Sequence, residues 1–142
     1  MSERRVSRAD RAEVMRRAGG SCEYCRSPVS YSADPFSAEH IVPAVRGGAT
    51  TLANLAFSCQ GCNNHKFTSV EAIDLVTAEI VPLYNPRAAR WSDHFAWSED
   101  STTVIGLTAI GRATIGKLRL NRPGVVNLRK LLHATGKHPP PE

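Results

Sequence analysis

The sequence predicts a small α+β protein, and three observations lead to this class. All four cysteines fall into two Cys-x-x-Cys pairs. Short apolar segments of strand length lie between and after these pairs, bounded by Gly and Pro. Helix signals precede the first pair and recur near the C-terminus. A chain of 142 residues has the size of one domain, or of a small module with an extension packed on it.

The first half of the chain contains the elements closest to the cysteines. Ser7 can cap a helix over residues 8–18. Strands are expected at 36–42, where Pro43 ends the run, and at 55–58. A short helix is expected over 60–67, starting at the residue after Cys59, the first cysteine of the second pair.

The second half of the chain should form hairpins and two helices. The expected elements are hairpins of 70–73 with 80–83 and of 95–97 with 103–106, a helix over 108–120 and a last helix from Pro123. Three aromatic residues, Trp91, Phe95 and Trp97, are expected to form a small core that closes this half onto the first rather than a base-stacking platform. We therefore expect a core with an N-terminal helix (1–67), an extension packed on it (68–135) and a disordered Pro-rich tail (136–142).

The cysteine pairs predict a bound zinc ion. Cys22 and Cys25 form the first pair, and Cys59 and Cys62 form the second. Two such pairs can supply four thiolates to one tetrahedral zinc. Four protein thiolates leave no open position for water or substrate, so this ion is expected to be structural.

A motif spans the region between the two pairs and the residues after them. In order, it contains Glu39-His40-Ile-Val-Pro43, Gly47-Gly48, Asn54-Leu55 and Cys59-Gln-Gly-Cys62-Asn63-Asn-His65-Lys66. Over about residues 5–67 the chain resembles the HNH endonuclease family. The resemblance implies a ββα-metal core, treble-clef-like in the zinc-bound members that Cys22 and Cys25 match. The second half resembles the extension found in many small stand-alone bacterial HNH proteins.

The resemblance also implies roles for individual residues. Glu39 and Asn63 would hold a catalytic divalent ion, His40 would activate the nucleophilic water, and Asn54 would orient the His40 imidazole. Carboxylate and amide oxygens suit Mg²⁺ or Mn²⁺ better than a second zinc. His65 is a possible substitute ligand.

Each of these residues also has an ordinary structural explanation. His40 could be a hydrogen-bonded core histidine, and Asn54 and Asn63 could cap turns or helices. His65 could contact phosphate or lie on the surface. Lys66 is expected to face a phosphate, with a solvated surface lysine as the alternative.

The charge distribution points to a polyanionic partner. The net charge is +5; residues 1–79 contain nine basic and nine acidic side chains, and residues 80–142 contain nine basic and four acidic ones. Arg112 and Arg119 are seven residues apart and share a helix face, with Arg122 close by. These three arginines are the expected DNA-backbone surface, because neutralising phosphates releases counterions.

The sequence thus predicts a metal-dependent HNH-type endonuclease acting on DNA, with structural Zn²⁺ and catalytic Mg²⁺ or Mn²⁺. The alternative is a non-catalytic zinc-finger module that only binds nucleic acid. No apolar run approaches the ~18 residues of a membrane span, and the N-terminus lacks a signal-peptide core, so a cytoplasmic protein without membrane contact is expected. Whether it acts as a monomer or a dimer stays open.

Overall fold

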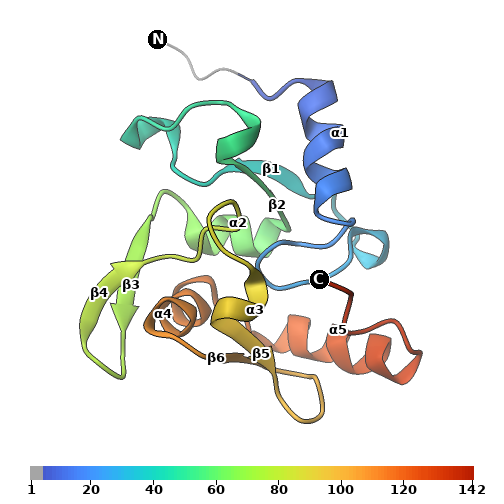
Figure 1. Ribbon diagram of the computed structural model, residues 1–142. Coiled ribbons are helices and arrows are strands. Elements are labelled where there is room, and N and C mark those ends of the chain that lie inside the picture. The colour runs from blue at the N-terminus through green and yellow to red at the C-terminus, as the bar shows by residue number, and fades with distance from the viewer. Residues whose placement is uncertain (1–4) are drawn as a thin grey trace.

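The first half of the chain forms a helix followed by a ββα unit (Figure 1). The computed structural model describes residues 5–142. The elements of this half, which we call the finger (residues 5–67), are α1 (Arg8–Arg17), β1 (Ser37–His40), β2 (Leu55–Ser58) and α2 (Gln60–Lys66). Single turns of 3₁₀ helix lie at Val29–Tyr31, Ala44–Arg46 and Leu52–Asn54.

Local sequence signals account for these elements. The Ser7 hydroxyl accepts a hydrogen bond from the Asp10 backbone N–H at 3.0 Å, and this N-cap starts α1 as predicted. β1 and β2 pair antiparallel, with His40 opposite Leu55. β1 ends two residues earlier than expected, because the backbone N–H of Val42 bonds to the side chain of Asn54 and leaves the ladder.

The remaining residues, 68–142, form the part that we call the extension. Its elements are β3 (Glu71–Asp74), β4 (Glu79–Pro82), α3 (Trp91–His94), β5 (Phe95–Trp97), β6 (Val104–Gly106), α4 (Ala109–Leu118) and α5 (Pro123–Ala134). β3–β4 and β5–β6 are antiparallel hairpins, and α4 lies against both hairpins and against α2. In Figure 1, α4 and α5 cover the side of the finger that carries α2. The described residues therefore confirm the predicted mixture of helices and small sheets.

One hydrophobic core joins the finger and the extension. Its buried members include Val14 and Leu55 from the finger and Leu118 and Val125 from the extension. Trp91 is buried, and its indole N–H donates to the carbonyl oxygen of Tyr24 at 3.0 Å. The aromatic cluster therefore closes the extension onto the finger, as the sequence predicts.

The C-terminal tail, where disorder was expected, lies against the β5–β6 hairpin. His138 is buried, with its ring 4.4 Å from that of Trp97 and its Nε2 atom 2.8 Å from the carbonyl oxygen of Ser101. The Glu142 carboxylate accepts a hydrogen bond from the Ser92 backbone N–H at 2.9 Å. Side chains of the tail thus find specific partners that its Pro-rich composition does not reveal.

Candidate functional site

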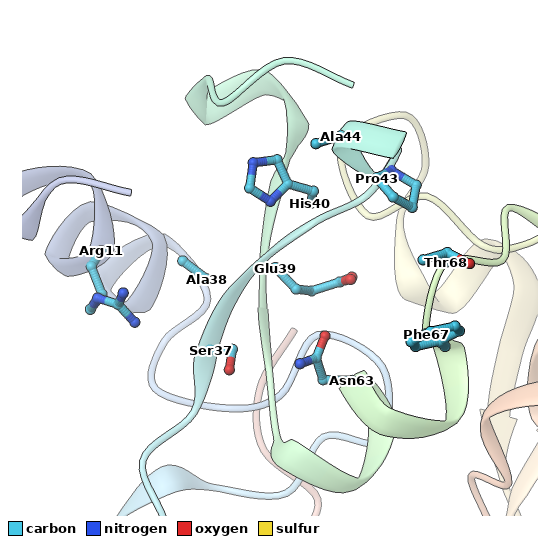
Figure 2. Close-up of a pocket in the computed structure, with 10 residues that line it drawn as sticks. All are labelled: Arg11, Ser37, Ala38, Glu39, His40, Pro43, Ala44, Asn63, Phe67 and Thr68. Carbon is cyan, nitrogen blue, oxygen red and sulfur yellow. The ribbon is translucent and has the colours of Figure 1, made fainter. Parts of the chain in front are cut away.

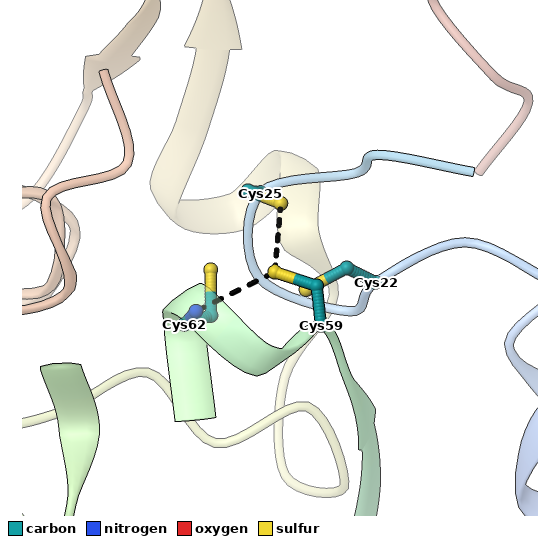
Figure 3. A group of neighbouring side chains, drawn as sticks. All are labelled: Cys22, Cys25, Cys59 and Cys62. Carbon is teal, nitrogen blue, oxygen red and sulfur yellow. Dashed lines mark hydrogen bonds between the residues drawn. The ribbon is translucent and has the colours of Figure 1, made fainter. Parts of the chain in front are cut away.

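The four cysteines come together at the junction of the first loop, β2 and α2 (Figure 3). All four are buried, and their Sγ atoms lie within 4.8 Å of one another, with 3.7 Å between those of Cys25 and Cys59. A tetrahedral zinc with Zn–S bonds of about 2.3 Å places its sulfurs ~3.8 Å apart. The cluster therefore fits a zinc ion bound by Cys22, Cys25, Cys59 and Cys62.

Groups around the cluster are arranged to stabilise thiolates. The backbone N–H groups of Tyr24 and Cys62 point at the sulfurs of Cys22 and Cys59, at 3.5 and 3.4 Å. The guanidinium of Arg122 lies 3.4 Å from Cys59 Sγ and 3.6 Å from Cys62 Sγ. Burial alone would lower the pKa of Arg122, but the neighbouring cysteines raise it.

Arg122 occupies a position that α2 leaves open. A Cβ atom at Gly61 would lie 2.5 Å from the Arg122 guanidinium. The glycine between Cys59 and Cys62 therefore lets the extension place a cation directly on the metal site.

An open pocket of about 330 Å³ lies beside the end of β1 (Figure 2). Among the residues that line it are Glu39 and His40 from β1, Asn63 from α2, Arg11 from α1 and Thr68. In Figure 2, the Glu39 carboxylate and the Asn63 side chain both lie between β1 and α2, while the His40 ring lies on the other side of the strand. The pocket thus brings together three of the predicted site residues.

Glu39 is held in place by two buried partners. Its Oε1 atom accepts a hydrogen bond from the Tyr24 hydroxyl at 2.5 Å, and its Oε2 atom lies 3.3 Å from the ammonium of Lys66. Burial nevertheless raises the pKa of Glu39, against the opposing effect of Lys66. The carboxylate is therefore a buried anion that its protein partners compensate only in part.

Lys66 does not face solvent, as a phosphate contact would require. Its side chain is 2% exposed, and its ammonium donates to the carbonyl oxygens of His40 and Ile41 at 3.3 and 2.9 Å. With Glu39, these contacts use all three donors of the ammonium. Lys66 is thus a buried anchor that ties α2 to the end of β1.

His40 is oriented by a hydroxyl group. Its Nε2 atom lies 2.8 Å from Thr50 Oγ1, in the loop between β1 and β2. The Thr50 hydroxyl can accept a hydrogen bond from Nε2 or donate one to it, so this contact fixes the orientation of the ring rather than its tautomer.

Asn54 shapes this loop instead of contacting His40. Its Oδ1 atom accepts from the Val42 N–H at 3.0 Å, and its amide donates to the carbonyl oxygens of Val42 and Ala49 at 3.0 and 2.8 Å. A Cβ atom at Gly48 would lie 1.7 Å from the Val42 carbonyl oxygen, so only glycine fits beside this bridge. Asn54 and Gly48 therefore set the path of the backbone that follows His40.

The remaining predicted residues lie away from the pocket. His65 faces the cations of the extension, and burial together with Arg122 and Arg119 lowers its pKa. Arg112 donates twice to the buried carboxylate of Asp74, at 2.9 Å each. Of the three arginines predicted to bind DNA, Arg112 and Arg122 are thus engaged within the protein, and Arg119 is exposed.

Residues that the motif does not mark also contribute to the site. Tyr24 and Thr50 hold Glu39 and His40, and Arg11 reaches the pocket from α1. Tyr24 lies inside the first cysteine pair, and its hydroxyl reaches Glu39 on β1. Nothing in the local sequence around Arg11 or Thr50 indicates these contacts.

The fold and the cysteine cluster define a zinc-binding ββα domain. Comparison with known proteins adds that residues 22–68 match the model of the HNH endonuclease family, so this segment resembles an HNH domain. Searches among curated proteins and among solved structures gave no match. A nuclease or nucleic-acid-related function follows from the domain. No helix in residues 5–142 is both long enough and apolar enough to cross a membrane.

Proposed function

We propose that the protein is a metal-dependent endonuclease that hydrolyses phosphodiester bonds in DNA. The observation that carries this proposal is that His40, Glu39 and Asn63 line one open pocket within the HNH domain. A module that only binds nucleic acid would need the zinc cluster but not this arrangement.

His40 acts in this proposal as the general base. An imidazole has an unperturbed pKa near ~6.5, which allows it to take a proton from water at neutral pH. In this proposal Nε2–H donates to the Thr50 hydroxyl, which leaves Nδ1 as the atom that accepts the proton. Thr50 is thus a positioning residue.

Glu39 and Asn63 would hold the catalytic ion. Two protein oxygens are a small ligand set, which suits Mg²⁺ because this ion keeps several waters and binds substrate phosphates. Because burial raises the pKa of Glu39, a cation bound beside its carboxylate would stabilise the charged form. When bound there, the ion would neutralise charge on the scissile phosphate and on the leaving oxygen.

The zinc has a structural role in this proposal. Four buried sulfurs fill its coordination sphere, and the ion would lock the loop that carries Tyr24 against β2 and α2. Tyr24 in turn holds Glu39, so the zinc site supports the pocket without taking part in the reaction.

Plasmid cleavage tests the proposal. Zinc-loaded protein is incubated with supercoiled DNA in Mg²⁺, in Mn²⁺ and without added divalent ion, and nicked and linear products are quantified. Cleavage should require the added ion, and His40→Ala should slow it by about 10²- to 10⁴-fold, the usual contribution of a general base.

His94→Ala is the matched control, because His94 contacts Thr108 in the extension and does not line the pocket. It should cleave at the wild-type rate. Zinc content and circular dichroism confirm that each variant is folded. DNA binding without cleavage by the wild-type protein would favour the non-catalytic module, and cleavage by His40→Ala at the wild-type rate would remove His40 from the mechanism.

A further inference from the structure

Arg11 is a cation on the wall of the pocket, and it forms no ion pair with any residue in 5–142. Arg11 lines the pocket from α1, and its side chain is exposed. Among the described residues, the Arg11 side chain has no hydrogen bond, ion pair or ring contact. Its guanidinium is therefore available to a ligand at the edge of the pocket.

A second free cation lies one turn earlier on the same helix. Arg8 is three residues before Arg11, a spacing at which helical side chains are neighbours. It too is exposed and without a partner among residues 5–142. Neither acidic residue of α1 pairs with these arginines: Glu13 bonds to Arg16 at 2.8 Å, and Asp10 forms no ion pair with a described residue.

A third cation is held on another side of the pocket. Arg46 follows β1, and its Nε atom donates to the carbonyl oxygen of Thr68 at 2.6 Å. Thr68 itself lines the pocket. The backbone contact fixes the position of the Arg46 side chain, while its charge stays without an acidic partner among the described residues.

The acidic content of the pocket does not cancel these charges. Among the residues of 5–142 that line it, Glu39 is the only acidic one, and it already pairs with Lys66. An anion that crosses the pocket would therefore meet uncompensated positive charge from α1 and from the turn after β1. Arginine suits this task because its planar guanidinium matches phosphate oxygens.

We propose that Arg8, Arg11 and Arg46, which we call the arginine rim, bind the phosphodiester backbone of duplex DNA on the two sides of the pocket. The inference rests on the proposed nuclease function and specifies how the substrate approaches it. The rim positions the backbone without reading its sequence, because phosphate contacts are the same for every base. It also moves the expected DNA surface from the extension to the finger.

The salt dependence of DNA binding tests the rim. Binding of a labelled duplex to zinc-loaded protein is measured without added divalent ion, so that the DNA stays intact, at several salt concentrations. Each lost phosphate contact lowers the slope of log K against log [salt] by about 0.9. Arg8→Gln/Arg11→Gln should therefore lower the slope by ~1.8, and adding Arg46→Gln should lower it by a further ~0.9.

The control removes the same charge from the extension. Lys117 and Lys130 are exposed on α4 and α5, and Lys117→Gln/Lys130→Gln should leave the slope at the wild-type value. Arg and Gln have similar helix propensities, so the rim variants should fold, which thermal melts and zinc content verify.

The outcomes separate the rim from the nuclease proposal. Equal slopes for the two double variants, or no binding of the duplex by the wild-type protein, would overturn the rim. If the rim variant alone loses slope while the wild-type protein cuts no plasmid, the rim stands as a binding surface and the nuclease proposal fails. If the wild-type protein cuts plasmid and the slopes are equal, the nuclease proposal stands and the rim fails.

Discussion

The finger and the extension have nearly the same net charge, but their cations do different things. Residues 1–67 contain nine basic and six acidic side chains, and residues 68–142 contain nine basic and seven acidic ones. Dividing the chain at residue 79 had placed the whole positive excess in the C-terminal part. Dividing it at residue 67 does not, because Glu71, Asp74 and Glu79 belong to the β3–β4 hairpin of the extension.

Several cations of the extension are engaged by groups of the protein itself, in the finger as well as in the extension. Arg112 pairs with Asp74, Arg122 lies on the cysteine cluster, and Arg129 is buried, with donors on the carbonyl oxygens of Cys25 and Leu120. In the finger, by contrast, Arg8 and Arg11 are exposed on α1, and Arg11 lines the pocket. The net charge of a region therefore does not show which of its cationic side chains are available to a partner.

The largest expected effect tests whether the two regions are one folding unit. Cys22→Ser should abolish zinc binding and unfold both regions together, because structural zinc contributes about 10–16 kcal/mol in small fingers and the core is shared. Both tryptophans, Trp91 and Trp97, lie in the extension, so their fluorescence reports on it, while circular dichroism reports on the whole chain. Native tryptophan emission in the zinc-free variant would show instead that the extension folds alone.

The second effect concerns the one buried lysine of the finger. Lys66→Met keeps the apolar stem but leaves the Glu39 carboxylate without its cation, and breaking a buried ion pair costs about 3–5 kcal/mol. Thermal or denaturant unfolding of the zinc-loaded protein measures this loss. The matched control is Lys130→Met, an exposed lysine of the extension, which should change stability little. Equal losses in the two variants would mean that Lys66 is not an anchor.

The third effect tests the contact by which the extension reaches the metal site. Arg122→Met should weaken zinc binding by about 10- to 100-fold, the usual effect of removing a group that supports metal ligands. Competition with a chelator measures the affinity. Arg122→Lys retains the charge and should recover part of it, whereas Lys117→Met should match the wild type. Zinc affinity unaffected by Arg122→Met would show that the guanidinium only packs against the sulfurs.

Sequence patterns predicted the features that depend on local spacing. β2 was expected at the residues where it lies, Thr108 caps α4, and the cysteine pairs meet in one cluster. These results follow from periodicity, capping and metal-ligand geometry, which short stretches of sequence encode.

The partners of the charged residues could not be predicted in this way. Lys66 and Glu39 are 27 positions apart, and Arg122 reaches a sulfur 63 positions earlier in the chain. Such pairs depend on how the elements pack, so a lysine expected on the surface is buried and an arginine expected on DNA lies on the metal site. The motif also marks Asn54, but only the structure shows that it bridges the backbone of Val42.

The smallest expected effect tests the charge pair that joins β3 to α4. Asp74 accepts from Arg112 and also from Thr77 Oγ1 at 2.8 Å, and these contacts, chiefly that of Arg112, hold the pKa of Asp74 well below its ordinary value of about 3.9. A carboxyl group whose pKa is lowered by folding stabilises the protein above its unfolded pKa, and this contribution is lost as the pH falls toward the folded value. The stability advantage of the wild-type protein over Asp74→Asn should therefore be constant above about pH 5 and shrink below about pH 4.

Parallel denaturant unfolding of the two proteins in excess zinc isolates this difference, because acid weakens the shared zinc site in both. An advantage that does not change between pH 3 and 7 would mean that the charge of the Asp74 carboxylate contributes nothing to stability. In that case the Arg112 charge would not be neutralised by Asp74 in the way the geometry indicates, and the contrast between engaged cations in the extension and free cations in the finger would lose one of its main supports.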